Sequence, residues 1–266
     1  MMSANCVFSV ICLALAGLLS AGCQGALGPQ GVAALTSGYQ AYQAGDNELT
    51  VRKMDDFLRD YPKGPRRDEA LVLRGMARYN LKDLGGAKSD LQEALAAARW
   101  SSTRAKAFYN LANVAYDMND MPLAVESCRQ VVAAAGGDAQ AVQLVAQAHY
   151  RLGTALQRQG KWTEADAHFH RAGHLAGDSD LAHLAAGRVN CRAWSVQAGA
   201  YGSKASADAA AARLRQNSLG ADVKADRLPT PRYIVQVGRF ETFEMADQAL
   251  REVKKLQDDA FVVTTE

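Results

Sequence analysis

The sequence lacks an excess of charge of either sign, and it contains few cysteines. Its 30 lysines and arginines are balanced by 28 aspartates and glutamates, which gives a formal net charge of +2. Such a chain has no long-range field that attracts a polyanion, so nucleic acid is not an expected partner. The 5 cysteines show no CxxC pair and no Cys/His spacing typical of zinc. The remaining composition, 48% hydrophobic and 22% charged, is that of a folded protein with room for two domains.

Motifs of the common enzyme classes are also missing. The sequence contains no GxSxG elbow, no HExxH, no P-loop and no Gly-rich dinucleotide fingerprint. Asp166, His170 and His174 are spaced four residues apart, a pattern that places them on one line of a helix and would suit a metal. Because this line lies beside the expected packing stripe, we interpret it as a solvated helix face. We therefore expect a binding protein with no catalytic residue, no metal and no cofactor.

The N-terminal segment is apolar and carries no charged residue before Asp46. Its apolar run, Val7 to Leu19, is too short for a hydrocarbon core that needs about 20 residues, so it predicts an export signal. The following residues 19–23, LSAGC, resemble the lipobox of bacterial lipoproteins. This resemblance implies a signal peptide over 1–22, a lipidated Cys23 and a tether over 23–31. Gln24 is compatible with an outer-membrane lipoprotein facing the periplasm. The alternative is a secretory signal with a chance cysteine.

A repeat in the middle of the chain predicts four helical hairpins. Small residues recur at Gly38, Gly75, Ala112 and Gly153, and sixteen residues after each stand Met54, Leu91, Cys128 and Phe169. A turn signal divides each copy, for example at Gly45-Asp46 and Asn119-Asp120. Small residues let the two helices of a copy approach, so the copies are expected to stack as a solenoid closed by a helix after Asp178. We expect Cys128 to be a buried free thiol and assign no state to Cys191.

This spacing resembles the tetratricopeptide repeat (TPR) over about Val32 to Gly177, within a helical domain that we expect at residues 32–190 with its capping helix. The best matched stretches are Arg74-Gly75 through Ala94 and Leu152-Gly153 through Ala172. TPR arrays bind peptides or protein surfaces, so the resemblance implies a scaffold with a protein partner in its groove. The alternative is a rigid spacer without a ligand.

The last part of the chain, residues 191–266, is duplicated with an offset of 39 residues. This offset places residues 194–199, WSVQAG, on residues 233–238, YIVQVG. Alternation predicts a strand in each half, and an apolar stripe predicts a following helix begun by Ser203 or Thr242. The result is a βαββαβ domain with both helices on the valine face of the sheet. Strand parity leaves four side chains on the other face: Ser195, Gln197, Ile234 and Gln236.

This arrangement resembles the SPOR domain, the sporulation-related repeat that binds peptidoglycan. The fold class is thus multi-domain: an all-α TPR solenoid followed by a small α+β domain of ferredoxin-like or RNP-like type. The resemblance implies binding of glycan strands stripped of stem peptides, as at division sites. By position it implies these glycan-binding residues: Ser195, Gln197, Gly199, Tyr201, Ile234, Gln236 and Phe240. Ala200 and Arg239 stand where the family commonly has serine and proline.

Three functions are compatible with these patterns. The first is a lipid-anchored envelope protein that binds peptidoglycan and recruits a protein through its repeats. The second is an envelope assembly factor whose SPOR-like domain has little glycan affinity. The third is a cell-wall hydrolase or its accessory, which is disfavoured because no carboxylate pair can be placed on the open sheet face.

Overall fold

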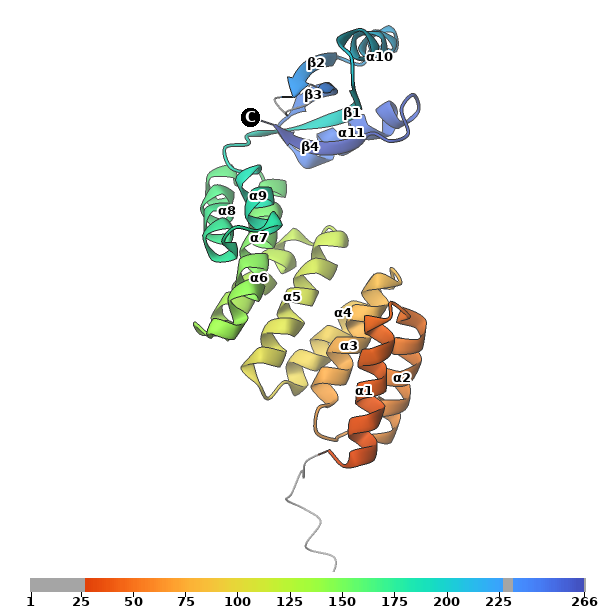
Figure 1. Cartoon of the computed structure of the whole chain (residues 1–266), viewed down its shortest axis with the longest axis vertical. Coiled ribbons are helices and arrows are strands. Elements are labelled where there is room, and N and C mark those ends of the chain that lie inside the picture. Colours follow the sequence, from red (N-terminus) through yellow and green to blue (C-terminus); the bar gives the residue numbers. More distant parts are fainter. Residues whose placement is uncertain (1–26, 227–231, 266) are drawn as a thin grey trace, which may run out of the picture. The chain divides into compact units, whose positions relative to one another are not determined.

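The computed structural model describes residues 27–226 and 232–265, and it forms two compact units divided in the sequence between Arg99 and Trp100 (Figure 1). The expected signal peptide and Cys23 lie outside the described residues. Within the described part, no helix combines the length and the apolar character needed to cross a membrane. The first helix begins at Pro29, inside the segment expected to be a tether. Each unit is described by itself below.

The first unit consists of two helical hairpins. They are formed by α1 (Pro29–Gln43) with α2 (Asn47–Asp60) and by α3 (Arg67–Asn80) with α4 (Leu84–Ala97). Their contact buries a cluster that includes Leu35, Met54, Phe57, Ala70 and Leu73.

The second unit begins with two more hairpins and a short helix. The hairpins are formed by α5 (Ser101–Asp117) with α6 (Met121–Ala135) and by α7 (Val142–Arg158) with α8 (Trp162–Ala176), and α9 (Asp180–Ala186) follows. A single 3-10 turn, Ala139–Ala141, precedes α7. Ala185 of α9 joins the core of the fourth hairpin, as the sequence predicts for a capping helix. The prediction of four hairpins and a cap is confirmed.

Pairs of small and large residues explain how the helices of a hairpin approach. A Cβ atom added to Gly38 would lie 2.2 Å from the Met54 side chain, and one added to Gly153 would lie 2.7 Å from the Phe169 ring. The third copy has Ala112 with the smaller Cys128, and both are buried in one cluster. The volume of the second-helix residue therefore compensates for that of the first. Cys128 is buried and free, as expected, and burial raises the pKa of its thiol to about 12.

The turn inside each hairpin contains one residue in the left-handed region. These residues are Gly45, Lys82, Asn119 and Gly160, with φ of 79°, 66°, 60° and 73°. In the first three hairpins the next residue is an aspartate whose carboxylate accepts a backbone N–H of the second helix, from Leu49, Gly86 or Leu123. The fourth hairpin begins α8 after Lys161 without a side-chain cap. The turn signals of the first three hairpins thus have a common structural basis in capping.

The second unit ends in a four-stranded antiparallel sheet with two helices. Its elements are β1 (Ala193–Tyr201), α10 (Lys204–Gln216), β2 (Ala221–Asp226), β3 (Arg232–Phe240), α11 (Phe243–Lys254) and β4 (Phe261–Thr265). The strand order is β2-β3-β1-β4. Ser203 and Thr242 cap the two helices as predicted. One core joins Val196 and Val235 of the central strands to Leu214 of α10 and Val253 of α11, which confirms the βαββαβ fold.

Candidate functional site

The sheet of the C-terminal domain has one face packed against α10 and α11 and a second face that these helices do not cover. Val196, Ala198, Val235 and Val237 belong to the buried core. Successive side chains of a strand point to opposite faces, so Gln197 and Gln236 lie on the other side. We call this second side the open face.

A row of four side chains crosses the open face at right angles to the strands. Gln197 of β1 is paired directly with Gln236 of β3. Asp222 of β2 is the partner of Gln236, and Phe261 of β4 is the partner of Gln197. Directly opposed Cβ atoms lie only about 4.5–5.5 Å apart, so the two amides are within reach of a single ligand. We call these four residues the glutamine row.

The two amides supply hydrogen-bonding groups without a net charge. Each glutamine offers two N–H donors and a carbonyl acceptor. The Oε1 atom of Gln236 is buried and has no hydrogen-bond partner among the described residues. A buried acceptor without a partner carries a desolvation penalty of about 1–3 kcal/mol. The two amides at the centre of the row therefore suit ligand groups such as hydroxyls and amides.

Phe261, like Asp222, is a residue of the glutamine row that is not among the residues predicted from the sequence. Its side chain is 51% exposed, at the end of the row beside Gln197. An exposed phenyl ring can pack against the apolar face of a ligand. The signal was present in the duplication, because Val262 falls on Val223 and must share its buried face, which leaves Phe261 on the open face.

The open face also includes a second row of side chains. It contains Ile234, one of the predicted glycan-binding residues, and Ala200, which stands where the SPOR family commonly has serine. Ile234 of β3 is half-buried there, between Lys224 of β2 and Ala200 of β1. Ala200 is exposed. Three of the seven candidates, Gln197, Ile234 and Gln236, thus share the open face.

Ser195 has a different role from the one expected. Only 1% of its surface is exposed. Its hydroxyl oxygen lies 2.9 Å from the backbone carbonyl oxygen of Gly238, to which it donates, and 3.3 Å from that of Val237, which is a second acceptor. The pairing of β1 with β3 is irregular at this point. The hydroxyl therefore stabilises the backbone of β3 at the irregularity and is not available to a ligand.

Gly199, Tyr201 and Phe240 lie on the helix side of the sheet. After a second irregularity that follows Gln197, Gly199 is paired with Val235 and Tyr201 with Tyr233. Val235 belongs to the core, and both tyrosines pack against it. The Tyr201 ring folds back over Gly199, where an added Cβ would lie 2.9 Å from it. The Phe240 ring folds over Gly238 in the same way, at 2.3 Å, and Gly238 has φ of 69°. The glycines thus make room for the aromatic rings, which do not face the glutamine row.

The first strand is held against the helices that precede it in the second unit. Trp194 packs against Trp162 of α8, with ring centroids 5.5 Å apart, and edge-on against Phe243 of α11 at 5.2 Å. Asp166 accepts bonds from the Asn190 backbone N–H and from Arg192 at 2.7 Å. Asp166, singled out in the sequence with His170 and His174, is therefore occupied by these contacts.

Two other histidines form a close pair between α7 and α8. The Nδ1 atoms of His149 and His168 lie 3.0 Å apart, so one ring donates to the other. Burial, with the neighbouring His168 and then Arg171, lowers the pKa of His149 to about 4. Burial also lowers the pKa of His168. The pair is neutral at pH 7, and the described residues contain no cluster of three metal-ligating side chains.

Two families match parts of this chain. Residues 192–264 match the SPOR domain, and residues 147–179 match the tetratricopeptide repeat. The domain with the glutamine row is therefore a SPOR domain, and the helical part belongs to the TPR class. Both are binding domains. No curated protein matches the chain in sequence.

A solved structure with a TM-score of 0.50 agrees with the helical fold. A tetratricopeptide repeat protein from Parabacteroides merdae is 15% identical, with a TM-score of 0.50, and the match covers 60% of this chain and 59% of that one. MamA from Desulfovibrio magneticus is 21% identical, with a TM-score of 0.46, over 61% of this chain and 93% of that one. At 15% identity the likeness to the Parabacteroides merdae protein concerns the fold alone.

Proposed function

We propose that this chain, with its TPR hairpins and C-terminal SPOR domain, binds the glycan strands of peptidoglycan and recruits a protein partner. The observation that carries the proposal is the glutamine row, in which two adjacent amides, one with an unpartnered buried acceptor, lie beside the exposed Phe261 ring. Sugars present hydroxyls, N-acetyl amides and apolar ring faces, which match these groups. The helical hairpins supply the surface for the protein partner.

Sedimentation of the purified full chain with sacculi tests this function. We expect the chain to sediment, and to do so more strongly after an amidase has removed the stem peptides, because the bare strand fits closer to the row. Failure to sediment with either preparation would contradict the proposal and favour the TPR-based assembly factor. Release of soluble muropeptides would instead revive the hydrolase.

Replacing Gln197 and Gln236 together with alanine is expected to weaken sedimentation by about 30-fold. Each lost hydrogen bond contributes about 1 kcal/mol to binding. The fold should persist, because both side chains lie outside the core. The matched control removes two exposed glutamines of the helices, Gln216 and Gln248, and should bind as the parent does. Equal binding by both double variants would show that the row is not the site.

The location of the chain in the envelope is a separate proposal. We infer export by residues 1–22, lipid attachment at Cys23 and an outer membrane facing the periplasm, with a role at division sites. The supporting observations are the apolar run and the LSAGC sequence. Incorporation of labelled palmitate by growing cells tests the anchor, and an unlabelled, soluble chain would contradict it.

A further inference from the structure

The third and fourth hairpins border a cavity of about 320 Å³. It is lined by α6 and the loop that follows it, by α7 and by α8, so the second helices of both hairpins contribute to it. Its apolar walls are formed by Val132, Ala135, Val142, Val145 and Leu175. Ligand pockets commonly measure about 300–1,000 Å³, so this volume suits a small group such as one or two apolar side chains. We call this space the hairpin cavity.

The loop after α6 forms one rim of the hairpin cavity and is longer than the corresponding connections. The small residues Ala112 and Gly153 are 41 positions apart, whereas the two earlier intervals are 37. The additional residues follow α6, where Gly136 and Gly137 adopt the left-handed region with φ of 53° and 81°. Gly137 lines the cavity. The cavity is therefore associated with an insertion that the earlier copies of the repeat lack.

A guanidinium without a partner lies at the α8 wall of the hairpin cavity. Arg171 is exposed and makes no hydrogen bond or ion pair within the described residues. Asp138, on the loop rim, is already used, because its carboxylate accepts the Gln140 backbone N–H at 2.9 Å. His149 of α7 also lines the cavity, but burial lowers its pKa to about 4, so it adds no positive charge at pH 7. The charge of Arg171 is thus available to a ligand.

The other hairpins show that the repeat does not require a free arginine at this position. The counterparts of Arg171, two residues after the large residue of each copy, are acidic or amide side chains: Asp56, Glu93 and Gln130. Each of the three is bound to a side chain of its own unit, respectively to Arg59 at 2.8 Å, to Arg67 and to Glu126 at 2.7 Å. The fourth hairpin alone has a cation here, and that cation is unpaired, so folding does not account for it.

We propose that the hairpin cavity binds an acidic segment of a protein, an inference that rests on the proposed recruitment of a protein partner by the helical hairpins. An apolar side chain of the segment packs among the valines. A neighbouring carboxylate forms two parallel hydrogen bonds with the planar guanidinium of Arg171. The apolar walls and the single unpaired charge thus define the chemistry of the partner.

Titration of the full chain with capped tetrapeptides, followed by the NMR shifts of its backbone amides, tests this proposal. The acidic probe is acetyl-Asp-Leu-Leu-Asp-amide. One comparison peptide has asparagine in place of both aspartates, and a second has glycine in place of both leucines. We expect each to bind about tenfold or more weakly than the acidic probe, because it lacks either the charged hydrogen bonds or the buried side chains.

Three results of this titration would overturn the proposal. The first is equal binding of the acidic probe and either comparison peptide, and the second is the absence of measurable binding by the acidic probe. Octanoate, which joins a carboxylate to an acyl chain, gives the third. Tighter binding of octanoate than of the acidic probe would assign the cavity to a fatty acid.

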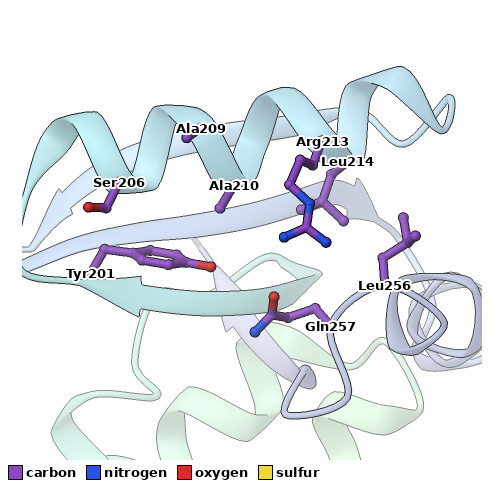
Figure 2. Close-up of a pocket in the computed structure, with 8 residues that line it drawn as sticks. All are labelled: Tyr201, Ser206, Ala209, Ala210, Arg213, Leu214, Leu256 and Gln257. Carbon is purple, nitrogen blue, oxygen red and sulfur yellow. The ribbon is translucent and has the colours of Figure 1, made fainter.

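The variant Arg171→Gln should lose the preference for the acidic probe, while its affinity for the asparagine peptide stays unchanged. The matched control is Arg213→Gln in the SPOR domain. Arg213 is also an exposed arginine beside a cavity, here of about 450 Å³, and Figure 2 shows its guanidinium directed into that space. This control should keep the preference. If the two variants behave alike, the proposal fails.

The variant Val142→Ser should weaken binding of the acidic and asparagine peptides by a similar factor, because it makes one apolar wall polar. Val142 is 38% exposed, and Val32 of α1 is 41% exposed. Val32→Ser is therefore the control and should bind both peptides as the parent does. Unchanged binding by Val142→Ser would place the peptides outside the cavity and contradict the proposal.

These titrations contain no glycan, so their outcome is independent of sedimentation with sacculi. A chain that sediments with sacculi but does not prefer the acidic probe retains the proposed glycan binding and loses the hairpin cavity as a protein site. A chain that prefers the acidic probe but ignores sacculi retains the protein site and loses the proposed glycan binding.

Discussion

Replacing Phe169 with alanine is expected to lower the free energy of unfolding of the second unit by about 3–5 kcal/mol. The Phe169 side chain is 1% exposed, and its ring covers Gly153 across the fourth hairpin. It also packs against Tyr150 at a centroid distance of 5.7 Å. The glycine has no side chain that could fill the space left by the ring, so a cavity remains at the centre of the hairpin.

Urea unfolding followed by far-ultraviolet circular dichroism measures this loss. The control is Phe261→Ala, which deletes the same side chain from a half-exposed position and should change the stability far less. Because the chain has two units, the transition is assigned by limited proteolysis of the fourth hairpin at intermediate urea. Equal stability of the two variants would mean that the match between Gly153 and Phe169 does not support the hairpin.

Replacing Trp194 with alanine should destabilise the SPOR domain by about 3–5 kcal/mol. This side chain is 3% exposed and lies between the rings of Trp162 and Phe243. The guanidinium of Arg158 lies 3.9 Å from the centroid of the Phe243 ring. Removal of the indole therefore exposes the first strand. The rings of Trp162 and Phe243 lose a packing partner, and the contact of Arg158 with the Phe243 ring is weakened.

Tryptophan fluorescence follows this change directly. The chain has 3 tryptophans, and Trp100→Ala is the control because Trp100 is 69% exposed. We expect the Trp194 variant to lose blue-shifted emission and to unfold at lower urea, whereas the Trp100 variant should unfold as the parent does. Trp194→Phe should recover part of the stability. Identical unfolding of the Trp194 and Trp100 alanine variants would contradict the packing described for β1.

The helical part could be predicted from the sequence because its determinants are local. Each hairpin needs a small residue, a larger one sixteen positions later and a turn between them, and all three recur along the chain. The division between Arg99 and Trp100 could not be foreseen. The interval between the small residues of the second and third copies is 37, the same as between the first and second, so the spacing gives no sign of it.

The candidate site was predicted only in part because register is a property of two strands. Superposing the two halves aligns β1 with β3 but does not show how these strands pair. The irregularities near Gly238 and after Gln197 bury Ser195 and turn Tyr201 and Phe240 toward the helices. Side-chain parity within one strand therefore identified Gln197 and Gln236 correctly as residues of the open face, but not the positions beyond each irregularity.

The pairing of Gln197 with Gln236 joins two positions related by the offset of 39 residues. Because β1 and β3 are antiparallel, a pseudo-twofold axis passes through the sheet between these two amides and exchanges the halves of the domain. The same axis exchanges Asp222 with Phe261, so symmetry holds at the centre of the row and is broken at its ends. A polymer lying along the row would meet a carboxylate at one end and a phenyl ring at the other. Identical amides would accept either orientation of the strand, and the unequal ends would select its polarity.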